Sequence, residues 1–369
     1  MANERALVVN LHIPYCIRPE RYSAASGMVG TNAQKDAYMR ALQREVRAWE
    51  GELEGYTVRA VRLGGGSASV MSPDLLGETL SLLRHTLPVA PGAEVSYDAL
   101  PNTIGTPSLT GISAGRPTRV ELMMRSGDDA ELRALDCAFT VQNTRNALLF
   151  LHRFCMNNVG LTLSYGIPGQ TDISWHNTLH AAVIAAPQHI SVDPLAVTDA
   201  EGMPDEEARF AMYAHACEFL GENGYAQYAA GRFCRPGHEY LFDALRRNGT
   251  DIVGMGTGAV TLLDGVMARN TNNCALYVKN SGDFEKQTAQ AFTLDDMQRM
   301  GEYALGRLSL VQGLTHALFE ARFGQRMPDT LLRAIRPLTA RGFAEETAEG
   351  FIPTLRGLFA AQNGRLSLE

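Results

Sequence analysis

The stretch YTVRAVRLGGGSAS, residues 56–69, contains the pattern that decides the fold of this chain. Its first eight residues alternate in the manner of a β-strand, and the strand stops at three consecutive glycines. Ser72 and Pro73 then begin the helical segment SPDLLGETLSLLRHTL, in the positions that helix caps and first helical residues favour. The stretch therefore predicts a unit made of a strand, a glycine loop and a helix.

The same order of strand and helix recurs along the chain. Strand patterns at ALVVNLHI, AEVSYDA, TRVELMM, NVGLTLSY and HISVDPL are separated by segments with helical spacing of apolar residues. About six such units fit before residue 230, and this order is typical of parallel strands joined by helical crossovers. We therefore predict an α/β fold with a barrel or partial barrel of parallel strands.

The last part of the chain has a different pattern. From about Phe292 onward the helical segments LDDMQRMGEYALGRLSL, THALFEARFG and DTLLRAIRPLTARGF follow one another, with a short strand-like end. The expected organisation is a barrel domain over residues 1–285 and a mainly helical C-terminal domain over residues 286–369.

Composition excludes several classes of protein. The chain has 369 residues, a formal net charge of −7 and a pI of about 5.8, which does not resemble a nucleic-acid binder. No stretch reaches the roughly 20 apolar residues of a membrane span, and the N-terminus lacks the pattern of a signal peptide. The six cysteines form no CxxC pair and are spread through the chain, so a disulfide framework is not expected. These features predict a cytoplasmic protein.

Three unusual loops follow predicted strands. They are the Cys16 loop HIPYCIRPERYS (residues 12–23), GGGSAS (64–69) and YGIPGQT (165–171). Ligands bind at the carboxyl ends of the strands in parallel barrels, so three such loops indicate one functional face. A fourth segment, GMGTGA (254–259), is equally consistent with a tight turn.

Two histidine-containing segments are candidate metal sites, but another interpretation is favoured for both. His176 and His180 stand one helical turn apart, yet the glutamate of an HExxH motif is missing and the segment begins an amphipathic helix. Cys234 and His238 are four residues apart in a predicted loop. A solvated or partly buried helix face and an ordinary loop account for these spacings.

Taken in order, LHIPYC, LGGGSAS, YGIPGQT, YAQYAAGRFCRPGHE and GMGTGA resemble one family. They are similar to the oxygen-independent coproporphyrinogen III oxidase-like radical S-adenosylmethionine proteins, and the branch that contains bacterial haem chaperones is the most similar. The resemblance extends from about Val8 to Phe359 and implies a partial (β/α)6 TIM-like barrel with a helical C-terminal domain.

The resemblance also implies a cluster loop, HIPFCxxxCxYC, whose three cysteines hold a four-iron four-sulfur cluster that binds S-adenosylmethionine. In this chain Cys16 is the one cysteine of that motif, and Glu20 and Ser23 stand at the other two positions. Iron–sulfur clusters are held by thiolates, and carboxylate or hydroxyl oxygens are harder, weaker ligands for them. The cluster is therefore predicted to be absent, which leaves a degenerate metal loop.

Part of the implied S-adenosylmethionine site persists and part is changed. Arg125 stands where the family usually has glutamine, Cys137 where it has arginine and Thr162 where it has aspartate. S-adenosylmethionine binding is therefore expected to be weak or absent. The predicted cofactor-binding residues are Gly64, Gly65, Gly66, Asp98, Ser126, Tyr165, Gly166, Pro168, Gly254 and Gly256.

Three hypotheses for function remain open. The first is a carrier or partner protein that binds haem or another tetrapyrrole without radical chemistry, with Cys16, Cys234 and His238 as candidate haem ligands. The second is an active radical oxidoreductase of porphyrin metabolism in which the cysteines of this sequence have been replaced or the cluster is held unusually. The third is a structural partner of an active paralogue. A recipient protein or a paralogue is the expected protein partner.

Overall fold

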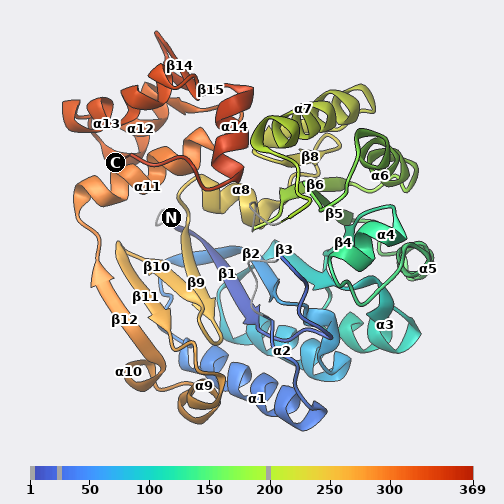
Figure 1. Ribbon diagram of the computed structural model, residues 1–369. Coiled ribbons are helices and arrows are strands. Elements are labelled where there is room, and N and C mark those ends of the chain that lie inside the picture. Colours follow the sequence, from blue (N-terminus) through green and yellow to red (C-terminus); the bar gives the residue numbers. More distant parts are fainter. Residues whose placement is uncertain (1–4, 23–26, 197–200, 369) are drawn as a thin grey trace. The chain divides into compact units, whose positions relative to one another are not determined.

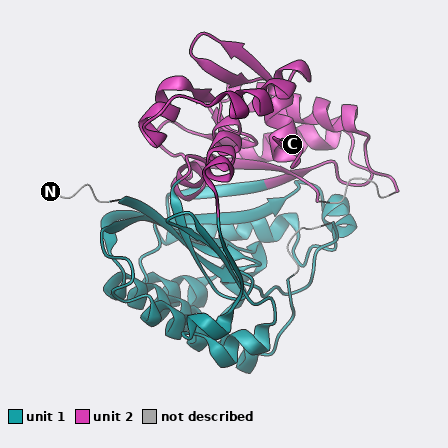
Figure 2. Ribbon diagram, turned by 90° about the vertical axis from the view of Figure 1, so that its left-hand side faces the viewer, with its two compact units in different colours: residues 1–162, 250–293 teal, residues 163–249, 294–369 magenta. Residues whose placement is uncertain are grey.

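The computed structural model of the chain describes residues 5–22, 27–196 and 201–368. It divides into two compact units, coloured separately in Figure 2. Unit 1 contains Met1–Thr162 and Thr250–Thr293, and unit 2 contains Leu163–Gly249 and Leu294–Glu369. The predicted boundary after residue 285 remains a prediction.

Unit 1 is built on a sheet whose central strands are parallel (Figure 1). The strand order is β12-β11-β10-β9-β1-β2-β3-β4, in which β9, β1, β2, β3 and β4 pair in parallel and β10, β11 and β12 are added in antiparallel fashion. Its elements are β1 (Arg5–Ile13), α1 (Asn32–Ala48), β2 (Tyr56–Gly65), η1 (Ala68–Val70), α2 (Pro73–Thr86), β3 (Val89–Ala99), η2 (Pro101–Thr103), α3 (Thr106–Ser113), β4 (Arg119–Arg125), α4 (Asp129–Ala134), α5 (Val141–Arg153), β9 (Asp251–Met255), β10 (Val260–Leu263), β11 (Val266–Asn270), α9 (Cys274–Asn280), α10 (Phe284–Gln287) and β12 (Thr288–Thr293).

Local sequence explains the central elements of unit 1. Leu7, Val8 and Val9 of β1 are all fully buried, as expected of a strand that is covered on both faces. The helix α1 begins with a capping box, in which Thr31 and Gln34 satisfy each other's backbone N–H groups. The helix α1 thus starts at a capping residue and β1 contains a continuous buried apolar run, whereas β2 mixes buried and partly exposed residues.

Unit 2 combines the remaining strands with most of the C-terminal helices. The division between the units falls within β5 (Val159–Tyr165). In unit 2 the strand order is β5-β6-β8-β7, and a separate small sheet has the order β13-β15-β14. Its elements are α6 (Asp172–Ile184), β6 (His189–Pro194), α7 (Glu206–Glu222), β7 (Ala226–Ala229), β8 (Arg232–Cys234), α8 (Leu241–Arg247), α11 (Asp296–Leu308), β13 (Leu314–Thr315), α12 (His316–Phe323), α13 (Asp329–Ala340), β14 (Ala344–Thr347), β15 (Gly350–Pro353) and α14 (Leu355–Gln362).

The predicted fold class is confirmed, with differences in detail. A largely parallel sheet with crossover helices is present, and the C-terminal region is mainly helical. The short helices α3 and α9 and the antiparallel strands β10–β12 were not predicted. They are short elements whose stability comes from packing on the parallel sheet, so local periodicity signals them weakly. Among the described helices, none combines the length and the apolar character that a membrane crossing requires.

A buried carboxylate fixes one end of the unit 1 sheet. Glu45 of α1 is 1% exposed. Its Oε2 accepts hydrogen bonds from the backbone N–H of Gly256 (2.8 Å) and the hydroxyl of Tyr277 (2.5 Å). Its Oε1 accepts from the side-chain amides of Asn270 (2.8 Å) and Gln287 (2.7 Å). Burial raises the pKa of Glu45, and the four donated hydrogen bonds oppose that rise.

Tyr38 extends this network to the strand that precedes the Cys16 loop. Its hydroxyl donates to the carbonyl oxygen of His12 (2.7 Å) and accepts from the backbone N–H of Thr257 (3.0 Å). Gly256 has φ +110°, and a Cβ there would lie 2.6 Å from both the His12 carbonyl oxygen and the Tyr38 hydroxyl. Glycine at this position therefore allows α1, the end of β1 and the loop after β9 to approach one another.

The Glu45 network gives a stability prediction. Replacing Glu45 by glutamine keeps the shape but turns one acceptor oxygen into a donor amide, so two buried donors lose their acceptor. Each buried donor without an acceptor costs about 1–3 kcal/mol, and removing the buried charge offsets part of this. We expect Glu45→Gln to lower the free energy of unfolding by roughly 2–4 kcal/mol, measured by urea denaturation.

Glu50→Gln, at an exposed position just after the same helix, is the matched control. It should change the free energy of unfolding by less than about 0.5 kcal/mol. Equal urea midpoints for Glu45→Gln and Glu50→Gln would contradict the central role of Glu45.

Candidate functional site

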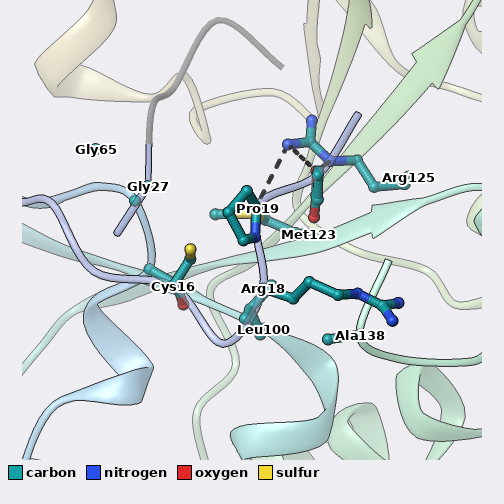
Figure 3. A pocket seen from close by; sticks show the side chains of 12 residues that line it. Cys16, Arg18, Pro19, Gly27, Gly65, Leu100, Met123, Arg125 and Ala138 are labelled. Carbon is teal, nitrogen blue, oxygen red and sulfur yellow. Dashed lines mark hydrogen bonds and ion pairs between the residues drawn. The ribbon is translucent and has the colours of Figure 1, made fainter. Parts of the chain in front are cut away.

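A pocket opens in unit 1, where β1, β2, β3 and β4 end (Figure 3). The Cys16 loop and the glycine loop, which the sequence places about 50 residues apart, both line it. The lining residues are Cys16, Arg18, Pro19, Glu20, Gly27, Gly65, Gly66, Ser67, Leu100, Met123, Arg125 and Ala138.

An ion pair crosses this pocket. The Arg125 guanidinium donates to Glu20 Oε2 through Nη2 (2.9 Å) and Nε (3.0 Å). The side chains of Arg125 and Glu20 are 19% and 13% exposed. At this degree of burial, removing one partner leaves a poorly solvated charge, which costs more than breaking a surface pair.

The backbone at both ends of the ion pair is unusual. Arg125, the last residue of β4, has φ +59°, a conformation that residues with a Cβ adopt rarely. In the Cys16 loop, the Arg18 guanidinium donates to the carbonyl oxygens of Asp136 (2.8 Å) and Cys137 (2.6 Å), and Arg21 pairs with Asp136 (2.5 Å). Arginines therefore hold the loop against the segment before α5.

The thiol of Cys16 lies half-buried at this pocket. Its Sγ would be 2.7 Å from a Cβ at Gly27, so glycine is required there for the loop to close over the thiol (Figure 3). Burial raises the pKa of Cys16, the Glu20 carboxylate raises it further, and Lys35 opposes the rise. The thiol form is thus favoured while Glu20 keeps its charge.

Cys137 is a second thiol beside Glu20. Burial, followed by the charge of Glu20, raises the pKa of Cys137 to about 12, and Arg125 and Arg18 oppose the rise. The charge of Glu20 thus acts on this thiol, while its carboxylate accepts from the guanidinium of Arg125.

The glycine loop at the end of β2 is joined to the Cys16 loop. The backbone N–H of Gly66 donates to the Ile13 carbonyl oxygen (2.6 Å), and that of Ser67 donates to the Tyr15 carbonyl oxygen (2.9 Å). A Cβ at Gly65 would lie 2.2 Å from the His12 ring, and one at Gly64 would lie 1.9 Å from Asp98. These glycines therefore permit close packing of β2 on its neighbours.

The other predicted cofactor residues of unit 1 are engaged with protein groups. Asp98 is 5% exposed and pairs with Arg62 (2.6 Å); burial raises its pKa, and Arg62 opposes the rise. The Ser126 hydroxyl is fully buried, donates to Glu131 (2.6 Å) and accepts from the N–H of Asp128 (2.9 Å). Neither residue is among those that line the pocket.

Gly254 and Gly256 lie at the end of β9, within the Glu45 network or next to it. The N–H of Gly256 donates to Glu45 (2.8 Å), and a Cβ at Gly254 would lie 2.3 Å from the Val260 carbonyl oxygen. Both positions therefore need glycine for packing.

The remaining predicted residues belong to unit 2. Tyr165 is fully buried and its hydroxyl donates to Gln362 (3.2 Å). The N–H groups of Gly166 (2.8 Å) and Ile167 (3.3 Å) donate to the side-chain oxygen of Gln170, which closes the turn that contains Pro168. The side chain of Gln170 thus accepts the backbone N–H hydrogen bonds of the YGIPGQT loop from within the loop itself.

The two other candidate haem ligands also lie in unit 2. Cys234, in β8, is 2% exposed, whereas His238 is half-buried in the loop that follows. Their roles as ligands remain predictions.

Ser23, the third position of the predicted metal loop, lies outside the described residues. Within residues 5–22, 27–196 and 201–368, no three histidine, cysteine, aspartate or glutamate side chains are grouped so that they could hold a metal ion.

Comparison with known proteins finds similarity to HemN and HemW proteins. The model of the HemN C-terminal domain matches residues 294–360. A curated relative, the heme chaperone HemW of Mycobacterium tuberculosis, is 28% identical over 266 residues, covering 68% of each chain. The oxygen-independent coproporphyrinogen III oxidase of Bradyrhizobium diazoefficiens is 24% identical over 360 residues, covering 90% of this chain and 80% of that protein.

The chain is similar to the HemN and HemW proteins of the radical S-adenosylmethionine family. Its fold matches that of the Escherichia coli coproporphyrinogen III oxidase HemN, a radical SAM enzyme, with a TM-score of 0.83 and 20% identity. The match covers 98% of this chain and 89% of that one. The resemblance seen in the sequence motifs is therefore confirmed, and so is the TIM-like fold that it implied.

Sequence reasoning missed three residues that position the segments of unit 1: Glu45, Arg18 and Gly27. Glu45 occupies a core-facing position of α1, one turn after Leu42 and next to Val46, and a charge on the apolar face of a helix is a detectable signal. Arg18 and Gly27 had no such signal, because their importance depends on which segments the fold brings to the pocket.

The environment of Cys16 predicts its reactivity. Glu20→Gln removes a negative charge that raises the pKa of Cys16, so more thiolate should be present at a given pH. We expect iodoacetamide to alkylate Cys16 several-fold faster in Glu20→Gln at pH 8, by up to about tenfold per unit of pKa change. The site-specific rate is read by mass spectrometry of peptides.

Cys155, which is exposed, provides the internal control and should react at the same rate in both proteins. An unchanged or slower rate at Cys16 would mean that Glu20 does not control this thiol.

Proposed function

We propose that this chain is a haem- or tetrapyrrole-binding member of the HemN/HemW family that acts as a carrier or partner protein without radical chemistry. The observation that carries the proposal is the Glu20–Arg125 ion pair across the pocket at the strand ends. It occupies the place where the family resemblance expects a cluster cysteine and a cofactor-binding glutamine.

The ion pair argues against an iron–sulfur cluster on this loop. Such a cluster needs several thiolates, and the loop supplies the thiol of Cys16 alone, since Glu20 and Ser23 occupy the other positions of the motif. Glu20 would also have to leave Arg125 to bind iron, which would leave a partly buried guanidinium without its carboxylate. The residues present do not fit the cluster, so we derive no reaction that requires it.

The predicted S-adenosylmethionine residues support the same view. The N–H of Gly66 donates to Ile13, Asp98 pairs with Arg62 and Ser126 donates to Glu131. A ligand that used these groups would have to replace existing hydrogen bonds, each worth about 0.5–1.5 kcal/mol and more when charged. Weak or absent binding of S-adenosylmethionine is therefore part of the proposal.

Exposed apolar side chains beside the pocket suit a tetrapyrrole. Ile17, Met28 and Val29, which are not among the lining residues, are 40%, 38% and 66% exposed. Ile17 and Met28 directly follow the lining residues Cys16 and Gly27 in the chain, so they offer an apolar surface beside the pocket on which a macrocycle could pack. Thiolate is an ordinary axial ligand of haem iron, and Arg18, which lines the pocket, would have to leave the carbonyl oxygens of Asp136 and Cys137 to bind a propionate.

The first test is reconstitution with iron and sulfide without oxygen. We expect the unaltered chain to retain no cluster, judged by iron per chain and by the broad visible absorbance of such clusters. The triple variant Glu20→Cys, Ser23→Cys, Arg125→Gln restores three thiols and removes the guanidinium, so it should gain iron.

Adding Cys16→Ser to that triple variant is the control, and it should abolish the gain. Near-stoichiometric four-iron content in the unaltered chain would sink the proposal and favour an active radical oxidoreductase.

The second test is haem titration. We expect a saturable Soret band at about one haem per chain, because a single axial thiolate and one apolar surface define one site. Cys16→Ser should shift the band or weaken binding by about tenfold or more. His238→Ala is the next variant if Cys16→Ser has no effect, since His238 is the half-buried alternative ligand.

Cys155→Ser, at an exposed thiol of the same unit, should leave the Soret band and the affinity unchanged. Uptake that never saturates would eliminate the carrier function, and a structural role beside an active paralogue would take its place.

A further inference from the structure

Two histidines from different helices of unit 2 face each other. His176 belongs to α6 and His215 to α7, and these helices pack side by side (Figure 1). The Nδ1 of His176 lies 3.1 Å from the Nε2 of His215. His176 is exposed and His215 is half-buried, so solvent reaches the pair.

The packing around the two rings fixes their positions. The indole N–H of Trp175, which is fully buried, donates to the carbonyl oxygen of Met212 (2.8 Å), one turn before His215. The Phe219 ring lies edge-on to the His176 ring, with centroids 5.0 Å apart, and its centroid is 6.0 Å from that of the His215 ring. The registers of α6 and α7 are therefore tied together beside the two imidazoles.

The distance between the two nitrogens suits a shared metal ion. Imidazole nitrogens bind Zn²⁺ at about 2.0–2.1 Å, so two of them at 90–110° lie about 2.9–3.4 Å apart. The observed 3.1 Å falls within this range. Without a metal, one ring has to donate its N–H to the other, whereas an ion between them uses both lone pairs.

We propose that His176 Nδ1 and His215 Nε2 form a two-imidazole site for a divalent transition-metal ion, with water completing the coordination. Imidazole suits the borderline metals, and affinity should increase from Zn²⁺ and Ni²⁺ to Cu²⁺. The proposal is independent of haem binding and of the pocket in unit 1. It also differs from the pairing that sequence spacing indicates, in which His176 joins His180.

His180 is the feature that makes the proposal testable. It lies one turn from His176 on α6, and the two rings are nearly parallel with centroids 6.5 Å apart. The rings of His176 and His215 are also stacked, with an interplanar angle of 30° and centroids 5.3 Å apart, so the 3.1 Å distance between their nitrogens is what distinguishes that pair. His180→Ala is therefore a matched control on the same helix.

The experiment is calorimetric titration of the untagged, chelator-treated chain with Ni²⁺, which does not oxidise the free thiols. We expect one Ni²⁺ per chain, with affinity at least about tenfold weaker in His176→Ala and in His215→Ala. His180→Ala should stay within about threefold of the unaltered chain. Ni²⁺ should also raise the melting temperature of the unaltered chain and of His180→Ala, because the ion links α6 to α7, but not that of the other two variants.

Unchanged circular dichroism of the three variants without metal shows that they fold. If His215→Ala binds Ni²⁺ as tightly as the unaltered chain, the proposed site is overturned. A weaker affinity in His180→Ala, together with an unchanged affinity in His215→Ala, also overturns the site, because the ligands would then be His176 and His180 of α6.

Discussion

The buried carboxylate of Glu45 is the interaction on which the arrangement of unit 1 depends. A carboxylate at 1% exposure is stable only when its oxygens receive hydrogen bonds, and Glu45 receives four. Its donors come from the loop after β9, from β11, from α9 and from α10. Through Tyr38, which donates to the His12 carbonyl oxygen, the same network sets where β1 ends and the Cys16 loop begins.

Backbone N–H groups of the glycine loops in this chain donate to oxygen atoms of the protein itself. Gly66 and Ser67 donate to the Cys16 loop, Gly166 and Ile167 donate to Gln170, and Gly256 donates to Glu45. Several of these glycines are also required by close packing, because a Cβ would clash with a neighbouring strand or side chain. Loops of this kind can be retained for packing after their role in binding a cofactor has changed.

The pocket at the strand ends is organised by charge. Glu20 and Arg125 neutralise each other at partial burial, and Arg125 has a positive φ, a conformation that residues with a Cβ adopt rarely. Glu20 also raises the pKa of both Cys16 and Cys137. One carboxylate thus couples the protonation of two thiols to an ion pair, in a pocket where the family resemblance expects cluster chemistry.

The sequence by itself determined the elements and the family. The strand, glycine loop and helix of residues 56–86 were predictable because alternation, glycine and capping depend on residues close in the chain, and the ordered motifs identified the family. The bonding partners of Glu20, Glu45 and His215 were decided by the tertiary structure alone. Glu20 and Arg125 are 105 residues apart, and His176 meets His215 across two helices, so no local spacing records these contacts. Ion pairs, buried hydrogen bonds and shared ligands depend on distances in space, and the packing of the sheet and helices sets those distances.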